Sequence, residues 1–366
     1  MKKYRIFVIN PGSTSTKLSL HENDEMVFST DVFHDSSILK TFPTINDQLE
    51  YRMEVIYRFL EENHIDLEGI DAIVGRGGGC YAVESGIYRV NERLIWDTKE
   101  AKGGLYHSSM LGVQMAEILH RRYGGLCLMM DPPIVDELDD LARITGVKGI
   151  YRKAVSHALN LKAAGRKRAE KLGRKYEDCN FIICHIDGGI SVTAHRKGRM
   201  VDGNDAGGGE GPFTPTRMGN MAVTDVNNLL RNRSYEEIRS LCSQTGGLSS
   251  HFNTSNSDAI VKMIHEGNRE AERVWKAMIY QVCKYIGSMA VVLDGKVDAI
   301  VLTGGLCRFD DVVETIREKC GFIAQLEVFP GEFEHEAMAA GALRVLKGEE
   351  ELKTYTGKPV WNGFED

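Results

Sequence analysis

Short apolar runs that end at glycine turns recur along this chain. Residues 6–9 form the first such run, which is long enough for a buried strand and too short for a helix. Pro11-Gly12 then breaks the chain, and a strand-like pattern resumes at residues 17–20. The chain is therefore predicted to begin with a strand, a tight turn and a second strand.

The same order returns in the second half of the chain. Residues 181–186 predict a strand, Asp187-Gly188-Gly189 a turn, and residues 190–195 a second strand. A later strand, at residues 297–302, also ends at a glycine pair. Two copies of strand, glycine turn and strand, one in each half, indicate two related domains with a cleft between them.

The remaining pattern alternates helices with strands, which is typical of an α/β fold. Further strands are expected at residues 27–33, 71–74, 126–130 and 200–202, and helices at 45–63, 234–242, 256–267, 268–293 and 337–346. The segment 103–119 is expected to open with Gly-Gly and Tyr106-His107-Ser108-Ser109 and then to become a helix. Ser234 and Glu237 have the spacing of a capping box. A basic helix at residues 156–172 is interpreted as a solvated face, as are most of Asp136, Glu137, Asp139 and Asp140. The polar tail from Lys347 is assigned no function.

Composition narrows the class of protein. A length of 366 residues favours two domains, and the net charge of −7 argues against a nucleic-acid-binding surface. No apolar run approaches membrane-spanning length, and the N-terminus has no signal-peptide pattern. The 8 cysteines are scattered without a C-x-x-C pair, as expected for reduced thiols rather than a zinc site. A cytoplasmic protein without membrane or nucleic-acid partners is expected.

Polar residues at the predicted turns and strand ends carry the candidate chemistry. Four hydroxyl residues follow Pro11-Gly12 and end at Lys17, so the turn offers backbone N–H groups, hydroxyls and an ammonium to a phosphate. An ordinary hairpin with a polar turn is the alternative. Asp131 ends a strand where open sheets bind ligands. His107, near the start of a helix, is either a structural cap or a catalytic group.

Seven motifs, in order along nearly the whole chain, together resemble the butyrate kinases, which belong with the acetate kinases in the sugar kinase–Hsp70–actin group. The motifs are Asn10-Pro11-Gly12-Ser13-Thr14-Ser15-Thr16-Lys17, Arg76-Gly77-Gly78, Asp131-Pro132, His157-Ala158-Leu159-Asn160, Gly188-Gly189-Ile190-Ser191, Gly211-Pro212-Phe213-Thr214-Pro215 with Arg217, and Leu302-Thr303-Gly304-Gly305-Leu306.

The resemblance implies two ribonuclease-H-like (actin-like ATPase) domains facing a nucleotide cleft. Residues 1–150 with a C-terminal helix at about 336–366 are expected to form a carboxylate and phosphate domain, and residues 151–335 a nucleotide-binding domain. The implied reaction is reversible in-line transfer, ATP + butanoate = ADP + butanoyl phosphate, with ATP and Mg²⁺ as cofactors. A homo-oligomer, a dimer or larger, is also implied.

The resemblance assigns roles that suit the residue types. Arg76 and Arg217 clamp the carboxylate and the phosphoryl group, because a planar guanidinium matches both. His107 and His185 donate hydrogen bonds to phosphoryl oxygens. Magnesium usually takes only a few oxygen ligands from the protein, and Asn10, Asp131 and Glu334 are assigned to it. Glu336 is an alternative to Glu334. Nucleotide and phosphate contacts are assigned to Asn10, Ser13, Ser15, Lys17, Gly188, Gly189, Thr303, Gly304 and Gly305.

The chain departs from the family at three places. Asp187 stands where relatives have glycine, and it is expected either to cap a neighbouring turn or to ligate magnesium. Asn256 and Asp258 replace an acidic residue and an arginine, which removes a cation near the nucleotide. Lys153 replaces a histidine of the acetate kinases and favours the butyrate branch.

Three alternatives to a butyrate kinase stay open. One is a kinase for another short acid: acetate, propionate, isobutyrate or a branched-chain acid. Another is an inactive or regulatory nucleotide-binding homologue, and a third is a structural protein without nucleotide. The glycine run at residues 77–79 is expected to leave space beside Arg76, which favours four-carbon acids over acetate.

Overall fold

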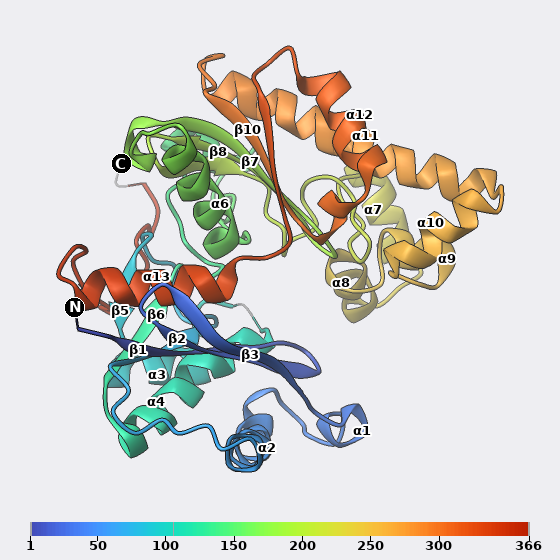
Figure 1. Cartoon of the computed structure of the whole chain (residues 1–366). Coiled ribbons are helices and arrows are strands. Elements are labelled where there is room, and N and C mark those ends of the chain that lie inside the picture. Colours follow the sequence, from blue (N-terminus) through green and yellow to red (C-terminus); the bar gives the residue numbers. More distant parts are fainter. Residues whose placement is uncertain (1, 105, 365–366) are drawn as a thin grey trace. The chain divides into compact units, whose positions relative to one another are not determined.

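The computed structural model describes residues 2–104 and 106–364 (Figure 1). The chain divides into two compact units, Met1–Asp136 with Phe333–Asp366, and Glu137–Glu332. The boundaries expected from sequence, at residue 150 and about residue 336, lie near these divisions, and residues 137–150 belong to the second unit. Leu105, in the segment before the helix expected within 103–119, and residues 365–366, in the expected C-terminal range, lie outside the described residues.

The first unit is built on a mixed sheet with the strand order β12-β5-β6-β4-β1-β2-β3. β1, β2 and β3 pair antiparallel in sequence, and β4 and then β6 follow in parallel on the other side of β1. The expected opening hairpin is confirmed, with Asn10 opposite Lys17. The strands are β1 (Arg5–Pro11), β2 (Ser15–Glu22), β3 (Glu25–Phe33), β4 (Ala72–Arg76), β5 (Ile87–Arg89), β6 (Leu126–Met130) and β12 (Lys353–Thr354).

Five α-helices belong to this unit in the described residues, and the last comes from the far end of the chain. They are α1 (Ser36–Leu39), α2 (Leu49–Glu62), α3 (Glu92–Lys99), α4 (Leu111–Tyr123) and α13 (Glu334–Leu346). The apolar stripe of α2 is confirmed, since Met53, Ile56 and Leu60 are buried in the core of the unit. Figure 1 shows α13 lying along the sheet beside β1 and β5, although α13 lies near the other end of the chain from these strands.

Two glycines bring α4 directly against β4. A Cβ on Gly75 would lie 2.2 Å from the carbonyl oxygen of Gly112, and one on Gly112 would lie 2.3 Å from the carbonyl oxygen of Arg76. Such distances leave no room for a methyl group. The glycine pair therefore fixes the start of α4 beside the strand end that carries Arg76.

The polar tail, for which no function was predicted, contributes a strand to the sheet. Its two-residue strand β12 pairs in parallel with β5. The next residue, Tyr355, is buried and donates its hydroxyl to Asp97 Oδ2 at 2.8 Å. A strand this short has no periodicity to detect in the sequence.

The second unit repeats the order of the first. Its sheet runs β11-β10-β7-β8-β9, with three antiparallel strands followed by two parallel ones. The two copies expected from the glycine turns are therefore present as two sheets of matching topology, and the expected α/β class is confirmed. The strands are β7 (Asn180–Ile186), β8 (Ile190–Arg196), β9 (Arg199–Gly203), β10 (Ala299–Gly304) and β11 (Leu326–Pro330).

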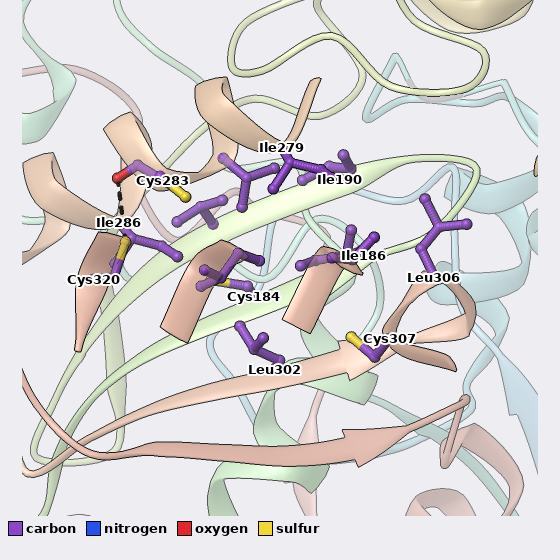
Figure 2. Packing of buried hydrophobic residues seen from close by; sticks show 14 of the residues in the cluster. Cys184, Ile186, Ile190, Ile279, Cys283, Ile286, Leu302, Leu306, Cys307 and Cys320 are labelled. Carbon is purple, nitrogen blue, oxygen red and sulfur yellow. Dashed lines mark hydrogen bonds between the residues drawn. The ribbon is translucent and has the colours of Figure 1, made fainter. Parts of the chain in front are cut away.

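The long helix α11 buries the apolar face of this sheet. Figure 2 shows Ile279 and Ile286 of α11 packed over Cys184 and Ile190 of the central strands, with Leu302 of β10 beside them. The α-helices described in this unit are α5 (Asp140–Arg143), α6 (Ala158–Lys171), α7 (Val223–Leu230), α8 (Tyr235–Ser243), α9 (Leu248–Phe252), α10 (Ser257–His265), α11 (Arg269–Val292) and α12 (Asp310–Cys320). The capping box at the start of α8 is confirmed.

Two expectations about charged segments are wrong. In α6, Lys162 and Arg168 are buried rather than solvated, and they pair with Glu137 at 2.8 Å and Glu327 at 2.9 Å. Residues 136–139 are not helical, and α5 begins only at Asp140. Charge alone cannot distinguish a solvated face from a set of ions whose partners lie far away in sequence. No helix in the described part of the chain is long and apolar enough to cross a membrane.

His335 in α13 makes the stability of the first unit sensitive to acid. Its Nδ1 lies 2.7 Å from Ser19 Oγ, and burial, the largest cause, lowers its pKa to about 4. We expect the free energy of unfolding to fall as the pH is lowered from about 6.5 to about 4, because only the unfolded chain takes up the proton in that range. Burial lowers the pKa of His34 to about 4 as well, which adds to the loss.

Urea unfolding at a series of pH values measures this dependence. His335→Asn keeps a polar atom near Ser19 and removes the titration, so it should lose less stability on acidification than the wild type. His64→Asn is the matched control, because His64 is exposed. Equal acid dependence in the wild type and His335→Asn would contradict the assignment.

Candidate active site

In the first unit, three predicted site residues come together at the ends of β1, β4 and the start of α13. Asn10 Nδ2 donates to Glu334 Oε2 at 2.6 Å, and Arg76 Nη1 forms an ion pair with Glu334 Oε1. Arg76 and Glu334 are only 6% and 8% exposed. Residues separated by more than 250 positions therefore form one buried polar cluster, in which Glu334 is the shared acceptor.

Asp131 lies just beyond β6 and is fully buried. Its Oδ1 accepts hydrogen bonds from Ser85 Oγ at 2.7 Å and Gly86 N at 2.8 Å. Its φ of +36° is rare for a non-glycine residue and is typical of a functional or tightly held position. These contacts make Asp131 a support for the turn before β5, and its role toward a metal stays a prediction.

The turn between β1 and β2 is held by Arg52, a residue that was not singled out from the sequence. Arg52 of α2 is fully buried and donates from Nη1 to Gly12 O at 2.9 Å and from Nη2 to Ser13 O at 2.8 Å. Burial lowers its pKa to about 10, so the guanidinium remains charged at neutral pH. The turn therefore has a fixed positive charge against its carbonyls, and Ser13 is exposed on it. The only sequence signal for this interaction is that Arg52 lies within an otherwise apolar stripe of its helix.

His107 acts as a cap, which was one of its two interpretations. It precedes the short helical turn Ser108–Met110, and its Nδ1 accepts from Ser109 N at 3.1 Å. A backbone N–H can only donate, so Nδ1 is unprotonated and Nε2 carries the hydrogen in the neutral ring. The cap thus leaves His107 able to act as a hydrogen-bond donor, and its catalytic role stays a prediction.

The glycines beside Arg76 are closely packed where side chains would lie. A Cβ on Gly77 would lie 2.4 Å from Met129 Sδ and 2.9 Å from Pro132 Cβ, and one on Gly78 would lie 2.6 Å from Ser109 Oγ. Side chains at these two positions would therefore clash with their neighbours. The space expected beside Arg76 stays a prediction.

In the second unit, the glycine turn after β7 is fastened to the loop that carries Arg217. Thr214 Oγ1 and Thr216 Oγ1 both donate to Gly188 O, at 2.7 and 2.8 Å. The guanidinium of Arg217 lies against Gly189, where a Cβ would meet Nη1 at 2.2 Å. This contact explains why position 189 is a glycine, because any side chain there would displace the guanidinium of Arg217.

Arg217 has the properties of a ligand-binding arginine. Its Nε and Nη1 are buried and have no hydrogen-bond partner among the described residues. Burial, the largest cause, lowers the pKa of this guanidinium, which still remains charged. Buried donors are normally satisfied, so two unsatisfied N–H directions on a cation indicate a site for an anion's oxygens.

Asp187 joins two glycine turns. Its Oδ2 accepts from Gly305 N at 2.6 Å and its Oδ1 from Gly188 N at 2.8 Å. The capping interpretation is therefore observed. Ligand atoms of His185, Asp187 and Glu332 also lie within 4.8 Å of one another, so the geometry admits a cation and the magnesium interpretation stays open.

Thr303 and Gly304 end β10 beside β7, where Thr303 is directly opposite His185. Gly304 has φ +97°, and a Cβ on it would lie 2.4 Å from Ile186 O. Asn160 of α6 contacts both His185 and Thr303, at 2.9 and 3.2 Å. It was part of a motif, but no role was assigned to it from the sequence.

Asn256 and Asp258, which depart from the family pattern near the Gly304-Gly305 turn, both have local structural roles. Asn256 caps α10, accepting from Asp258 N at 3.0 Å. Asp258 in turn pairs with Arg308 at 2.8 Å, and Arg308 Nη1 donates to Gly305 O at 2.8 Å. Arg308 was not singled out, and it supplies a cation at the turn where one was expected to be lost. Lys153, the third departure, is exposed.

Comparisons with known proteins agree with these motifs. Residues 146–344 match the model of the acetokinase family. The chain is 40% identical over 355 residues to butyrate kinase 2 of Clostridium acetobutylicum, a match covering 96% of this chain and 99% of that protein.

Among solved structures, an acetate kinase from Porphyromonas gingivalis has a TM-score of 0.73 at 18% identity, covering 94% of this chain and 100% of the other. A propionate kinase from Francisella tularensis subsp. tularensis has a TM-score of 0.74 at 17% identity, covering 92% and 98%. At these identities the structures support the shared fold alone.

The contact between Asp187 and Gly305 can be tested directly. Asp187→Gly should speed amide hydrogen exchange at Gly305 by about tenfold or more, because a hydrogen bond to a charged group is worth about 1.5–3 kcal/mol. Asp187→Asn keeps an acceptor oxygen and should retain most of the protection. Asp294→Gly, at an exposed position with φ +56°, is the control. Unchanged exchange at Gly305 in Asp187→Gly would show that the carboxylate does not hold the turn.

Proposed function

Because the chain belongs to the acetokinase family, we propose that it transfers the terminal phosphoryl group of ATP to a short-chain carboxylate, with butanoate as the substrate. The reaction is ATP + butanoate = ADP + butanoyl phosphate, and it is reversible. The observation that carries this proposal is the full-length similarity to a butyrate kinase. A kinase for isobutyrate, propionate or acetate uses the same chemistry and is distinguished by assay.

The substrate is its own nucleophile in this reaction. A carboxylate is already ionised at neutral pH, so the protein needs no strong general base. Phosphoryl transfer depends mainly on positioning and on neutralising charge. Arg76 and Arg217 would supply that charge, one toward the carboxylate and one toward the phosphoryl group. The unsatisfied donors of Arg217 support this role.

Magnesium would be held by Asn10, Asp131 and Glu334. Their amide and carboxylate oxygens are of the type that magnesium prefers, and a few such ligands suffice because the ion keeps several waters. Glu334 is favoured over Glu336 because it is buried against Asn10 and Arg76, whereas Glu336 is exposed. When bound, the ion would neutralise charge on the nucleotide phosphates.

The nucleotide would be bound by the glycine turns. Ser13, Ser15 and Lys17 offer hydroxyl and ammonium donors, and the Gly188-Gly189 turn offers backbone without side chains. Thr303, Gly304 and Gly305 would accommodate the adenosine, with Arg308 as an added cation. Asp187 and Asn256 each hold a local turn or helix start, which gives these two departures from the family a structural role.

We further propose a cytoplasmic homo-oligomer. Each of the described cysteines is a free thiol, as expected in a reducing compartment. An apolar segment of the second unit supports self-association, since Leu141, Ile144, Val147 and Ile150 are 88%, 55%, 59% and 58% exposed. Exposed apolar residues gathered in one segment are typical of an interaction surface.

The arginines provide a test of the catalytic assignment. Arg217→Ala and Arg76→Lys should each lower kcat by about a hundredfold or more, the effect of removing one oriented transition-state donor. Arg76→Lys is preferred to Arg76→Ala because truncation would leave Glu334 without its buried cation. Arg121→Ala is the matched control, since Arg121 is exposed and pairs only locally, with Glu117. Wild-type kcat in either folded site variant would refute the clamp.

An acid series identifies the substrate. The protein is incubated with ATP, magnesium and hydroxylamine, which traps an acyl phosphate as a hydroxamate. We expect kcat/KM to be higher for butanoate or isobutanoate than for acetate. A higher value for acetate would contradict the proposed substrate. Absence of hydroxamate with every acid, in a protein that binds ATP, would instead favour an inactive nucleotide-binding homologue.

A further inference from the structure

Asn160 has contacts that the proposed reaction does not yet explain. It lies in the first turn of α6 and is fully buried. Its Nδ2 is 2.9 Å from His185 Nδ1 on β7 and 3.2 Å from Thr303 Oγ1 on β10. His185 and Thr303 are themselves only 1% and 0% exposed. One amide thus connects the ends of two neighbouring strands.

The hydroxyl of Thr303 determines the orientation of that amide. Thr303 Oγ1 donates to Gly331 O at 3.0 Å. A hydroxyl has one hydrogen, so toward Asn160 this oxygen acts as an acceptor and must face the amide nitrogen. With the amide reversed, the single hydroxyl hydrogen would have to serve two oxygens. The orientation that suits the Thr303 hydroxyl places Nδ2 of Asn160 against both His185 and Thr303.

An amide nitrogen only donates, so Nδ1 of His185 accepts and is unprotonated, and Nε2 carries the hydrogen in the neutral ring. We propose that Asn160 is a positioning residue that holds His185 as the Nε2–H tautomer, so that the ring presents a donor to the phosphoryl oxygens during transfer. The catalytic part of this inference rests on the proposed function, whereas the assignment of the His185 tautomer is independent of it.

The surroundings of His185 add to this argument. His157 stacks on its ring with centroids 4.0 Å apart and planes at 18°, which restrains the ring. His157 is itself tied through Nδ1 to Ser191 Oγ at 2.8 Å. Carboxylate oxygens of Asp187 and Glu332 lie within 4.8 Å of a ring nitrogen of His185. A rival role, as a cation ligand with these carboxylates, requires a nitrogen lone pair that a protonated Nε2 does not have.

Nitrogen NMR tests the tautomer without reference to activity. Long-range ¹H–¹⁵N spectra of ¹⁵N-histidine-labelled protein should show His185 with a protonated Nε2 and a bare Nδ1. In Asn160→Asp the carboxylate accepts instead of donating, so the neutral ring should carry its proton on Nδ1. Asn180→Asp adds a carboxylate at the other end of β7 and should leave His185 unchanged. A protonated Nδ1 in the neutral wild-type ring would overturn the proposal.

The kinetic constants test the link to catalysis. At neutral pH, Asn160→Asp should lower kcat by about a hundredfold, with KM changed less than about threefold, because an unprotonated Nε2 repels phosphoryl oxygen. A merely structural role would not change kcat and the His185 tautomer together while KM is kept. Wild-type kcat in a folded Asn160→Asp variant whose His185 carries its proton on Nδ1 would overturn the positioning role.

A second variant keeps the test usable if a buried carboxylate prevents folding. Thr303→Val is nearly isosteric and removes the hydroxyl that orients the amide. It should give a mixture of His185 tautomers in the same spectra. An unchanged single tautomer would overturn the inference that Thr303 orients the Asn160 amide. Failure of the proposed function is separately visible, because the wild type would then lack turnover while its His185 tautomer stays as expected.

Discussion

The buried ion pair between Arg76 and Glu334 is the interaction on which the first unit depends. A buried charge is tolerated only when it is paired, and removing one partner of such a pair costs about 3–5 kcal/mol. The pair joins the end of β4 to the start of α13, and Asn10 completes it by donating to the same carboxylate. The chain's last helix is thereby fixed to its first sheet. The residues proposed to bind carboxylate and magnesium are held in place by the same contact that holds the fold.

The second unit meets a related constraint with close backbone packing and side-chain hydrogen bonds. Three glycine-containing segments approach one another so closely that side chains are excluded, and hydrogen bonds then fasten them. Thr214 and Thr216 hold Gly188, and Asp187 holds Gly305. Arg217 fills the place that a side chain on Gly189 would take. The arginine is therefore held by its surroundings, yet keeps donor hydrogens for an anion.

Local patterns in the sequence predicted most of the elements and the position of several site residues at strand ends, because apolar periodicity and glycine turns are local signals. Contacts between distant residues were not predictable. Arg52 and Asn160 act through partners far along the chain, and Arg308 pairs with the distant Asp258, and nothing in their immediate neighbours indicates those partners. The tight packing of Gly77 was not predictable for the same reason, since it depends on Met129 of another strand. The two-residue strand β12 is too short to give any pattern.

The reverse reaction tests the central claim most directly. Butanoyl phosphate and magnesium-ADP are supplied to the purified protein, and ATP is measured with a coupled luciferase assay. The account predicts rapid formation of ATP that depends on both substrates and ceases in Arg217→Ala. A folded wild-type protein that binds ADP but forms no ATP from butanoyl phosphate would contradict it.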